Sequence, residues 1–330
     1  MDGRMLRVEY VERGPALQDL LHLVERPMPT PGPGEALVAM QAAPINPSDL
    51  LTITGQYGLL PALPSVAGNE AVGTVMMVAD DVRHIRADDR VVVPPGFGTW
   101  TTHLVVPANL LWTVPVDADL LQLAMVRVNP PTAALMLRDF VALQRGDWVI
   151  QNAANGSVGE CVVQLARHRG IRTVNIVRRD DAVLSLQPLG ADVVLVDGPG
   201  LAARVAEATG GAPIRLGLDG VGGRATERLA STLAAGGTVV HYGASGGESS
   251  RLSPRSLIFR DITLRGFWLV HWFRRTSFEE QQTLYRELTT LIQRGELRVR
   301  VQATFPLARV HEAVTLAAQD GRQGKVLLTP

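Results

Sequence analysis

Length and composition describe a folded protein without a strong overall charge. Of the 330 residues, 46% are hydrophobic and 19% are charged, a balance typical of globular rather than disordered chains. The length suits two domains, and the equal numbers of basic and acidic residues, 32 each, favour neither nucleic acid nor an anionic membrane as a partner. No apolar run reaches the roughly 18 residues needed to span a membrane.

The first 120 residues show short apolar strands that are broken by proline and glycine. Examples are residues 35–49, 71–79 and 90–100. Turn residues at such close spacing are typical of an all-β unit. We therefore expect a barrel-like first domain.

Beyond residue 130, strand-like runs alternate with helical ones. The expected strands are residues 147–153, 173–177, 193–196, 215–219, 238–242 and 262–268, and the first expected helices are 158–168 and 181–189. This alternation predicts right-handed βαβ units, and hence an α/β domain with a doubly wound parallel sheet. Helical stretches at 277–294 and 308–319 and a last strand at 325–329 form a tail, which we expect to return to the first domain.

A glycine-containing turn joins the first strand of the α/β region to its first helix. Residues 154–159 read Ala-Asn-Gly-Ser-Val-Gly, a variant of the dinucleotide fingerprint with alanine in the first glycine position. Gly156 would let the backbone approach a pyrophosphate, and Gly159 would let the helix pack close to the sheet. The alternative is a tight turn in a sheet that binds nothing.

The residues after the second strand of this region indicate which of the two nicotinamide cofactors, NADH or NADPH, the protein prefers. An NAD-preferring site usually has an acidic residue there for the ribose, whereas this chain has Arg178 and Arg179, followed by Asp180. Guanidinium groups suit a 2′-phosphate, because they stay charged and present several donors in a plane. The pattern favours NADPH over NADH, and Asp180 would soften that preference if it pointed at the ribose. An exposed basic turn is the alternative.

The residues that a zinc site needs are missing from the sequence. Cys161 is the only cysteine, so neither a disulfide within the chain nor a four-cysteine structural site can form. Gly68-Asn69-Glu70 stands where zinc alcohol dehydrogenases tend to read Gly-His-Glu, and the seven histidines show no ligand spacing. We therefore expect no bound metal.

Several segments together resemble one known family. They are Asn46–Asp49 (NPSD), Gly55–Gly58 (GQYG), Gly68–Glu70 (GNE), Gly98–Trp100 (GTW), Val128–Pro130 (VNP), Val149–Ala153 (VIQNA) and Leu264–Leu269 (LRGFWL). On these segments the chain resembles, nearly end to end, the zinc-free branch of the medium-chain dehydrogenase/reductase superfamily. It most closely resembles the mitochondrial-type 2-enoyl thioester reductases, and the tyrosine of the second segment and the last segment are the most discriminating features.

The resemblance implies which residues form the site. Tyr57 matches the family's catalytic tyrosine, and Lys325, the only lysine of the chain, matches a position at the cofactor. The positions that line the NADPH site in this family are Asn129, Asn155, Gly156, Ser157, Val158, Arg178, Arg179, Asp180, Tyr242, Gly243, Ala244, Ser245, Phe267, Trp268, Leu269 and Lys325. Ser245 replaces a larger residue of the relatives. For the aromatic run that includes Phe267, Trp268 and Trp272, burial in the core is the alternative.

The resemblance also implies the domain organisation. We expect a GroES-like, barrel-type catalytic domain of residues 1–121 and 269–330, and between them a Rossmann domain of residues 122–268 that binds NADP(H). Homodimers would form by pairing of the two Rossmann sheet edges, which would protect an open strand edge. The first residues show no targeting peptide, from which we expect a bacterial cytoplasmic protein.

Three functions are compatible with the sequence. The first is NADPH-dependent reduction of the C2=C3 double bond of an enoyl-CoA or an enoyl-acyl carrier protein, with hydride added to the β-carbon and Tyr57 as hydrogen-bond and proton donor. The second is a quinone or α,β-unsaturated ketone reductase, and the third is an NADPH-binding structural or regulatory protein. Tyr57 favours the first, because a quinone reductase needs no acid placed for a thioester enolate.

Overall fold

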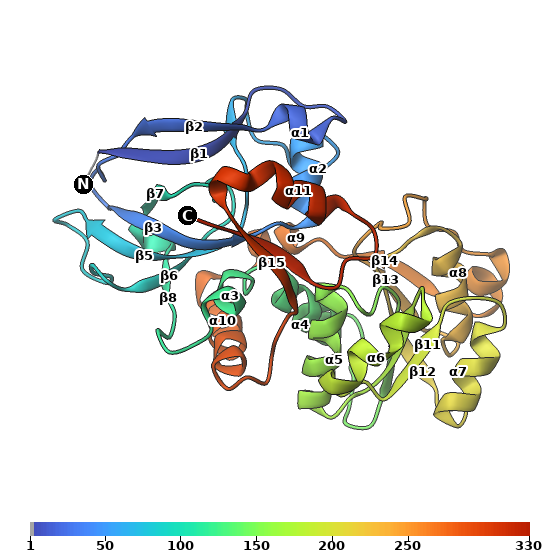
Figure 1. Cartoon of the computed structure of the whole chain (residues 1–330). Coiled ribbons are helices and arrows are strands. Elements are labelled where there is room, and N and C mark those ends of the chain that lie inside the picture. Colours follow the sequence, from blue (N-terminus) through green and yellow to red (C-terminus); the bar gives the residue numbers. More distant parts are fainter. Residues whose placement is uncertain (1–2) are drawn as a thin grey trace. The chain divides into compact units, whose positions relative to one another are not determined.

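The computed structural model describes residues 3–330, which form two compact units (Figure 1). The first unit runs from the start of the described chain to Val128 and resumes from Gln282 to Pro330. The second unit is Asn129–Gln281. Two stretches of chain therefore build the first unit, and both boundaries lie later in the sequence than the expected ones at residues 121 and 268.

Strands dominate the first unit. They are β1 (Arg4–Tyr10), β2 (His22–Pro27), β3 (Glu35–Pro44), β4 (Ser65–Val66), β5 (Ala71–Val78), β6 (Arg90–Val93), β7 (His103–Pro107), β8 (Trp112–Thr113), β15 (Val301–Pro306) and β16 (Lys325–Thr329). A three-stranded sheet has the order β2-β1-β4, and a seven-stranded sheet has the order β15-β16-β3-β5-β6-β8, with β7 paired to β3. The expected β-rich first domain is thus present.

Few helices belong to the first unit. They are α1 (Leu17–Leu20), α2 (Pro47–Thr54), α3 (Leu120–Ala124) and α11 (Val310–Ala318), with 3₁₀ turns at Ala108–Leu110 and Leu307–Arg309, while α10 (Phe278–Gln293) begins in the second unit and ends in the first. The apolar faces of the strands and of α11 form one core, in which Val8, Trp100 and Val310 are fully buried.

The tail completes the first unit, as the sequence predicts. Strand β16 pairs with β15 in parallel and with β3 in antiparallel orientation, with Leu327 opposite Pro44 and Leu328 opposite Ala43. The last strand is therefore an interior strand of the seven-stranded sheet. This position buries the side chains of Lys325 to Leu328.

The second unit contains the predicted doubly wound sheet. Its strands are β9 (Trp148–Gln151), β10 (Arg172–Val177), β11 (Val193–Val196), β12 (Ile214–Asp219), β13 (Thr238–His241) and β14 (Thr263–Gly266). All neighbours are parallel, and the order is β11-β10-β9-β12-β13-β14. This is the Rossmann order, in which ligands bind at the carboxyl ends of the strands near the point where the order reverses, here between β9 and β12.

Helices lie on both sides of this sheet (Figure 1). They are α4 (Asn129–Asp139), α5 (Ser157–Arg169), α6 (Val183–Leu186), α7 (Leu201–Thr209), α8 (Gly223–Thr232) and α9 (Leu269–Arg275), with 3₁₀ turns at Asp180–Ala182 and Gln187–Leu189 and a π-helical turn at Arg255–Phe259. Ile150, Ile176 and Val239 of the strands and Leu229 of α8 belong to the core. Within residues 3–330, no helix has both the length and the apolar character that crossing a bilayer requires.

Three expected elements differ from the structure. The single helix expected at 181–189 is wrong: the segment forms α6 between two 3₁₀ turns, because Pro188 lacks the N–H that a continued α-helix requires. The strands expected at 35–49 and 90–100 end at Pro44 and Val93. Helix α2 begins at Pro47, because Asn46 and Asp49 form a capping box around this residue, which suits the first helical turn.

Candidate active site and cofactor site

Tyr57 lies in the loop that follows α2 in the first unit. Gly55 ends the helix at φ 83°, in the left-handed region that favours glycine. The backbone N–H groups of Gln56 and Tyr57 then donate to the carbonyl of Leu51 at 2.7 and 3.1 Å. The side chain of Tyr57 is half-buried. The loop thus ties the residue to the helix while part of the phenol stays accessible.

A buried polar cluster surrounds the other end of α2. The backbone N–H of Asn46 donates to Asp49 Oδ2 at 2.7 Å, and its side-chain amide donates to Glu70 Oε2 at 2.9 Å. Asp49 Oδ1 accepts a further hydrogen bond from Asn69 Nδ2 at 3.0 Å. Asn46, Asp49 and Glu70 are all buried. Buried polar groups are costly unless they are paired, so these bonds hold the start of the helix in one position.

Lys325 belongs to this cluster. Its side chain is buried at the start of β16, and its ammonium group donates to Asn46 Oδ1. Lys325 is therefore not an exposed residue before an edge strand, although its position in the sequence would also suit one. An ammonium group has three donors, so this bond alone does not decide the expected cofactor contact, which stays a prediction.

Burial raises the pKa of both carboxyl groups in the cluster. The pKa of Asp49 rises to about 6 and that of Glu70 to about 7, because desolvation disfavours the charged forms. Hydrogen bonds from Asn46 and the charge of Lys325 act in the opposite direction at both groups, without cancelling the effect of burial. The cluster therefore contains two carboxyl groups that titrate closer to neutral pH than carboxyl groups in water.

The residues near the cluster do not offer a zinc ligand set. Asn69 stands in the position of the missing histidine, and its amide is engaged with Asp49. In the part of the chain that the structure describes, no three histidine, cysteine, aspartate or glutamate side chains come together as possible metal ligands. Zinc independence stays a prediction, and no step of the chemistry below depends on a metal.

Metal removal is expected to leave the protein unchanged. Since the donor set for zinc is missing, prolonged chelation should alter neither kcat nor the melting temperature. Activity and bound metal would be measured before and after dialysis against a chelator. Stoichiometric zinc in the purified protein, lost together with activity, would contradict this expectation.

The glycine turn of the second unit has the expected close packing. Gly156 precedes the first turn of α5, in extended conformation. A Cβ atom on Gly159 would lie 2.4 Å from the carbonyl oxygen of Ala154, so only glycine fits where the helix passes the turn. The amino terminus of a 13-residue helix therefore faces the carboxyl end of β9, where its unpaired N–H groups suit a phosphate. These residues fit a dinucleotide.

Arg178 and Arg179 follow β10 and are exposed, as a contact with a 2′-phosphate requires. Nε of Arg179 lies 3.1 Å from Asp181 Oδ1, and both side chains of this ion pair are more than half exposed. Exposed ion pairs are weak, so a phosphate can replace Asp181 at little cost. Asp180 is exposed and begins the next 3₁₀ turn.

Four of the predicted cofactor segments meet at one edge of the sheet. Asn155–Val158 follows β9, Arg178–Asp180 follows β10, Tyr242–Ser245 follows β13 and Phe267–Leu269 follows β14. The carboxyl ends of parallel strands lie together, so the Rossmann order brings these segments to the side where such folds bind dinucleotides. Asn129, the remaining predicted residue of this unit, is buried at the first position of α4.

The aromatic residues at this edge are not all core residues. Tyr242, Phe267 and Trp268 are half-buried, whereas Trp272 is buried, as the core interpretation predicts. Phe267 is held in place by its backbone N–H, which donates to the carbonyl of His241 at 2.9 Å. Burial raises the pKa of the Tyr242 phenol, and the nearby carboxylate of Asp219 raises it further. Tyr242 therefore stays protonated at neutral pH.

Sequence reasoning missed a second polar cluster at the same edge. The buried Asp219 accepts hydrogen bonds from Asn152 Nδ2 at 2.6 Å, Thr226 Oγ1 at 2.6 Å and His241 Nδ1 at 3.0 Å. Burial raises the pKa of Asp219, but the hydrogen bonds from His241, Thr226 and Asn152 outweigh it and hold the pKa well below its usual range. Asn152 also accepts from the backbone N–H of Gly220 at 2.7 Å. Polar residues directly after apolar strands are the signal that was available.

Two family models match the chain. The alcohol dehydrogenase GroES-like domain matches residues 32–116, and the zinc-binding dehydrogenase model matches residues 157–288. The first match lies within the first unit, and the second covers the second unit from α5 onward. The expected combination of a GroES-like and a Rossmann domain is confirmed.

Relatives of known function identify the family. The mitochondrial enoyl-[acyl-carrier-protein] reductase of Rattus norvegicus is 40% identical over 298 residues, which cover 88% of this chain and 80% of the relative. That of Xenopus tropicalis is 40% identical over 322 residues, which cover 95% of this chain and 91% of the relative. The chain belongs to the enoyl thioester reductase family of the medium-chain dehydrogenases/reductases. The family resemblance of the sequence is thereby confirmed, while the role of Tyr57 stays a prediction.

Solved structures share this fold over nearly the whole chain. The complex of Etr1p with NADP and crotonyl-CoA gives a TM-score of 0.90 at 24% identity and covers 99% of this chain and 100% of the other, a likeness that shows the fold alone. The Etr1p/Etr2p heterodimer of Candida tropicalis, a mitochondrial 2-enoyl thioester reductase, gives 0.90 at 25% identity with the same coverage. A mycobacterial quinone oxidoreductase gives 0.84 at 31% identity, again covering 99% and 100%. Enoyl thioester reductases and quinone reductases therefore share the fold, which does not choose between them.

The family corrects the expected location. The sequence led us to expect a bacterial cytoplasmic protein. The relatives from Rattus norvegicus, Xenopus tropicalis and Arabidopsis thaliana are all mitochondrial enzymes of eukaryotes. The expected bacterial cytoplasmic location is therefore wrong, because these relatives point to mitochondria.

Proposed function

We propose that the protein reduces the C2=C3 double bond of a 2-enoyl thioester with NADPH. The observation that carries this proposal is the 40% identity to enoyl-[acyl-carrier-protein] reductases over most of both chains. A glycine turn against a helix amino terminus, followed by two exposed arginines after the second strand, supports NADP(H) as the cofactor. When bound, NADPH supplies the hydride for the β-carbon.

Tyr57 is the proposed hydrogen-bond and proton donor. Hydride addition to the β-carbon moves negative charge onto the thioester carbonyl oxygen and the α-carbon, so a donor must stabilise that enolate and a proton must reach it. A phenol suits both tasks at neutral pH, because its unperturbed pKa is about 10. The half-buried phenol of Tyr57, in a loop tied back to α2, supports this role.

The surface around Tyr57 suits an acyl chain. No charged residue occurs between positions 55 and 65, and the loop is held by Arg13, whose guanidinium donates to the carbonyl of Pro61. Apolar side chains gather on this loop and on the adjoining end of α2, with exposures from 37% to 50%: Leu51, Leu59, Leu60 and Leu63. Exposed apolar groups of this kind are typical of binding surfaces, and they support a thioester with a hydrocarbon chain as substrate.

The proposed cofactor residues are those at the sheet edge of the second unit, together with Asn129 and Lys325. The helix amino terminus at Gly156 and Ser157 is proposed to bind the pyrophosphate, and Arg178 and Arg179 the 2′-phosphate. The backbone of Tyr242–Ser245 and of Phe267–Leu269, at the ends of β13 and β14, is proposed to contact the nicotinamide side. Their common edge supports the assignment.

A quinone or α,β-unsaturated ketone reductase is the second candidate function. The mycobacterial quinone oxidoreductase of the same fold favours it. The two functions differ in what they require of Tyr57, because a quinone accepts a hydride without an acid placed for a thioester enolate. NADPH oxidation with crotonyl-CoA beside a simple quinone tests the choice. We expect the higher kcat/KM with crotonyl-CoA, and no turnover of the thioester would end the proposal.

We also propose that the protein is a homodimer paired through β14. This strand is an edge of the parallel sheet, and all four of its residues are exposed. The π-helical turn that precedes the strand adds apolar side chains: Leu257, Ile258 and Phe259 are 46%, 70% and 80% exposed. An open apolar edge is a liability for a monomer, and pairing of two copies would cover it. A monomer mass in analytical ultracentrifugation would refute the dimer.

A further inference from the structure

The buried cluster at the start of α2 is bonded to two segments of the first unit, α2 and the backbone of Arg127 and Val128. Asn46, Asp49, Glu70 and Lys325 are 2%, 1%, 0% and 3% exposed, so water reaches none of them appreciably. We infer that Glu70 is a positioning residue for the reduction: through Asn46, which Lys325 also bonds, it holds the helix that carries Tyr57, and it holds the backbone of Arg127 and Val128 that leads to Asn129. This inference rests on the proposed role of Tyr57.

Helix α2 connects the cluster to Tyr57. Asn46 receives the ammonium donor of Lys325 on its Oδ1 and donates its amide to Glu70, so its side chain has one orientation only. Its backbone N–H bonds to Asp49 in the capping box. The helix is eight residues long, about 12 Å, and Tyr57 is bonded to its last turn. A shift of Asn46 therefore moves the helix and the phenol together.

The other oxygen of Glu70 binds the backbone at the end of the first unit. Oε1 accepts from the backbone N–H of Arg127 at 2.6 Å and from that of Val128 at 2.9 Å. These are the last residues of the first unit, directly before Asn129. An ionised carboxylate accepts all three of these hydrogen bonds with both oxygens, whereas a protonated one carries an O–H donor on one of them. A glutamine would turn an NH₂ group toward one of the two partners.

When both carboxyl groups are ionised, the charges of the cluster balance. The carboxylates of Asp49 and Glu70 are two negative charges, and Lys325 and Arg127 are two positive ones. The charge of Lys325 lowers the pKa of Glu70, and the charge of Glu70 raises the pKa of Arg127. The Arg127 guanidinium lies 4.3 Å from the centroid of Trp112 and 4.9 Å from that of Tyr285. Buried charges persist only when paired. A chain that uses arginine at every other basic position has its one lysine here, where a compact ammonium group is buried.

The cluster gives the reaction a pH dependence. The titratable groups that interact with Glu70 are Lys325 of β16, Arg127 and the phenol of Tyr285 of α10, and Asp49 of α2 is connected to it through Asn46. With the pKa of Glu70 raised to about 7, acidification places a proton on one of the oxygens that accept its three hydrogen bonds, which weakens the bonding at that oxygen. Activity should therefore fall as the pH drops through about 7.

The contribution of Glu70 to the stability of the fold should increase as the pH drops, whereas the activity falls. A buried carboxyl whose pKa is raised in the folded state favours folding when protonated, so its contribution is fully present below its unfolded pKa of 4.5 and is lost as the pH rises through about 7. Between these values, the contribution of Glu70 to stability increases toward acid while the activity decreases. A residue that only stabilised the fold would not separate the two properties in this way.

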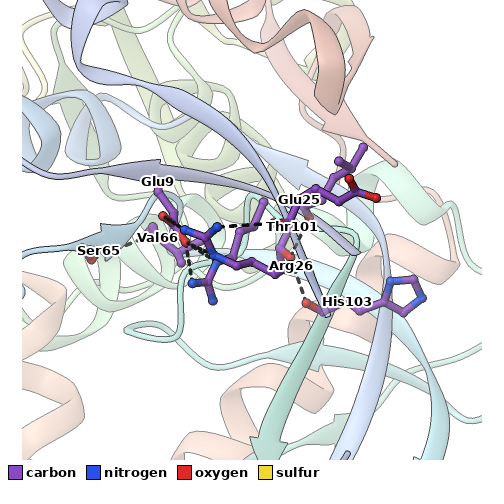
Figure 2. Close-up of polar contacts among 9 residues, drawn as sticks. Glu9, Glu25, Arg26, Ser65, Val66, Thr101 and His103 are labelled. Atoms are coloured by element: carbon purple, nitrogen blue, oxygen red, sulfur yellow. Dashed lines mark hydrogen bonds and ion pairs between the residues drawn. The ribbon is translucent and has the colours of Figure 1, made fainter. Parts of the chain in front are cut away.

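The test compares Glu70→Gln with Glu9→Gln in the full chain. Glu9 is a matched control, because it is also a buried glutamate of the first unit and accepts from Arg7 Nε at 2.5 Å and from Arg26 at 2.7 Å. Figure 2 shows Glu9 beside Arg26. In Glu70→Gln we expect kcat with crotonyl-CoA to fall by about tenfold to hundredfold, as for small misplacements of a reacting group. The KM for NADPH should change less than kcat, and the acid limb near pH 7 should disappear. Glu9→Gln should keep kcat and the acid limb.

Amide hydrogen exchange provides a readout that does not depend on turnover. In the unmodified protein, the protection of the Arg127 and Val128 amides, corrected for intrinsic rates, should fall as the pH drops through about 7, and this measurement needs no variant. Unchanged protection, or a Glu70→Gln enzyme that keeps both kcat and the acid limb, would overturn the inference. If crotonyl-CoA is not reduced at all, the proposed function fails, while the exchange experiment still decides whether the cluster holds this backbone.

Discussion

Tyr57→Phe should lower turnover of crotonyl-CoA by about 10²-fold, within the range that general acid–base catalysis contributes. The substitution keeps the ring and removes only the hydroxyl, so the enolate loses its donor while the loop keeps its packing. Because the loop is tied to α2 through backbone bonds to Leu51, the protein should stay folded. Steady-state kinetics, with the melting temperature measured in parallel, would check this result.

The control for this variant is cofactor binding. NADPH affinity should be unchanged, since the residues proposed to bind it lie in the second unit, apart from Lys325. A variant that reduces crotonyl-CoA at the unmodified rate while quinone activity is high would favour the quinone reductase interpretation.

Replacing Arg178 and Arg179 by alanine should weaken NADPH binding by tenfold or more. A charge-assisted hydrogen bond contributes about 1.5–3 kcal/mol, and about 1.4 kcal/mol corresponds to a factor of ten. Arg179 must leave its exposed ion pair with Asp181 to bind the phosphate, but this reduces the free energy of NADPH binding little, because such pairs are weak. Affinity for NADH should stay nearly constant, since it has no 2′-phosphate. Titration of both cofactors would measure the change.

The unmodified protein provides the sharpest control for this assignment. It should prefer NADPH over NADH by at least about tenfold, the ratio that one such bond supplies. Equal affinity for the two cofactors would show that neither arginine contacts a 2′-phosphate. A preference that survives the double substitution would assign the discrimination to another residue.

Local patterns in the sequence were sufficient to predict the strands of the second unit, although not its boundaries. Each parallel strand there is a short apolar run between turns, and the polarity changes sharply at its ends, as at Trp148–Gln151 and Val193–Val196. Helix 181–189 was the exception, because the effect of Pro188 on the hydrogen bonding outweighs the apolar periodicity. In the first unit, strand 325–329 was predicted with its correct bounds. Its interior place between β15 and β3 depends on the pairing with β3, which joins residues more than 200 positions apart in sequence and which no local pattern encodes.

The site was predicted less completely than the fold. Tyr57, the glycine turn and the arginine pair can each be recognised from a short contiguous segment of the sequence. The clusters around Asp219 and Glu70 depend on side chains from several distant strands and helices, as in the bond from Lys325 to Asn46. For the same reason, the burial of Lys325 could not be predicted from its position before a strand.

The fate of the hydride tests the central claim most directly. The protein would be incubated with crotonyl-CoA and NADPH that carries two deuterium atoms at C4 of the nicotinamide, and the thioester product would be analysed by mass spectrometry and NMR. We predict butyryl-CoA with one deuterium, located on C3, because the hydride adds to the β-carbon and the α-carbon takes its proton from the protein and solvent. Deuterium on C2, or NADPH oxidation by a quinone with no butyryl-CoA formed from crotonyl-CoA, would contradict the account.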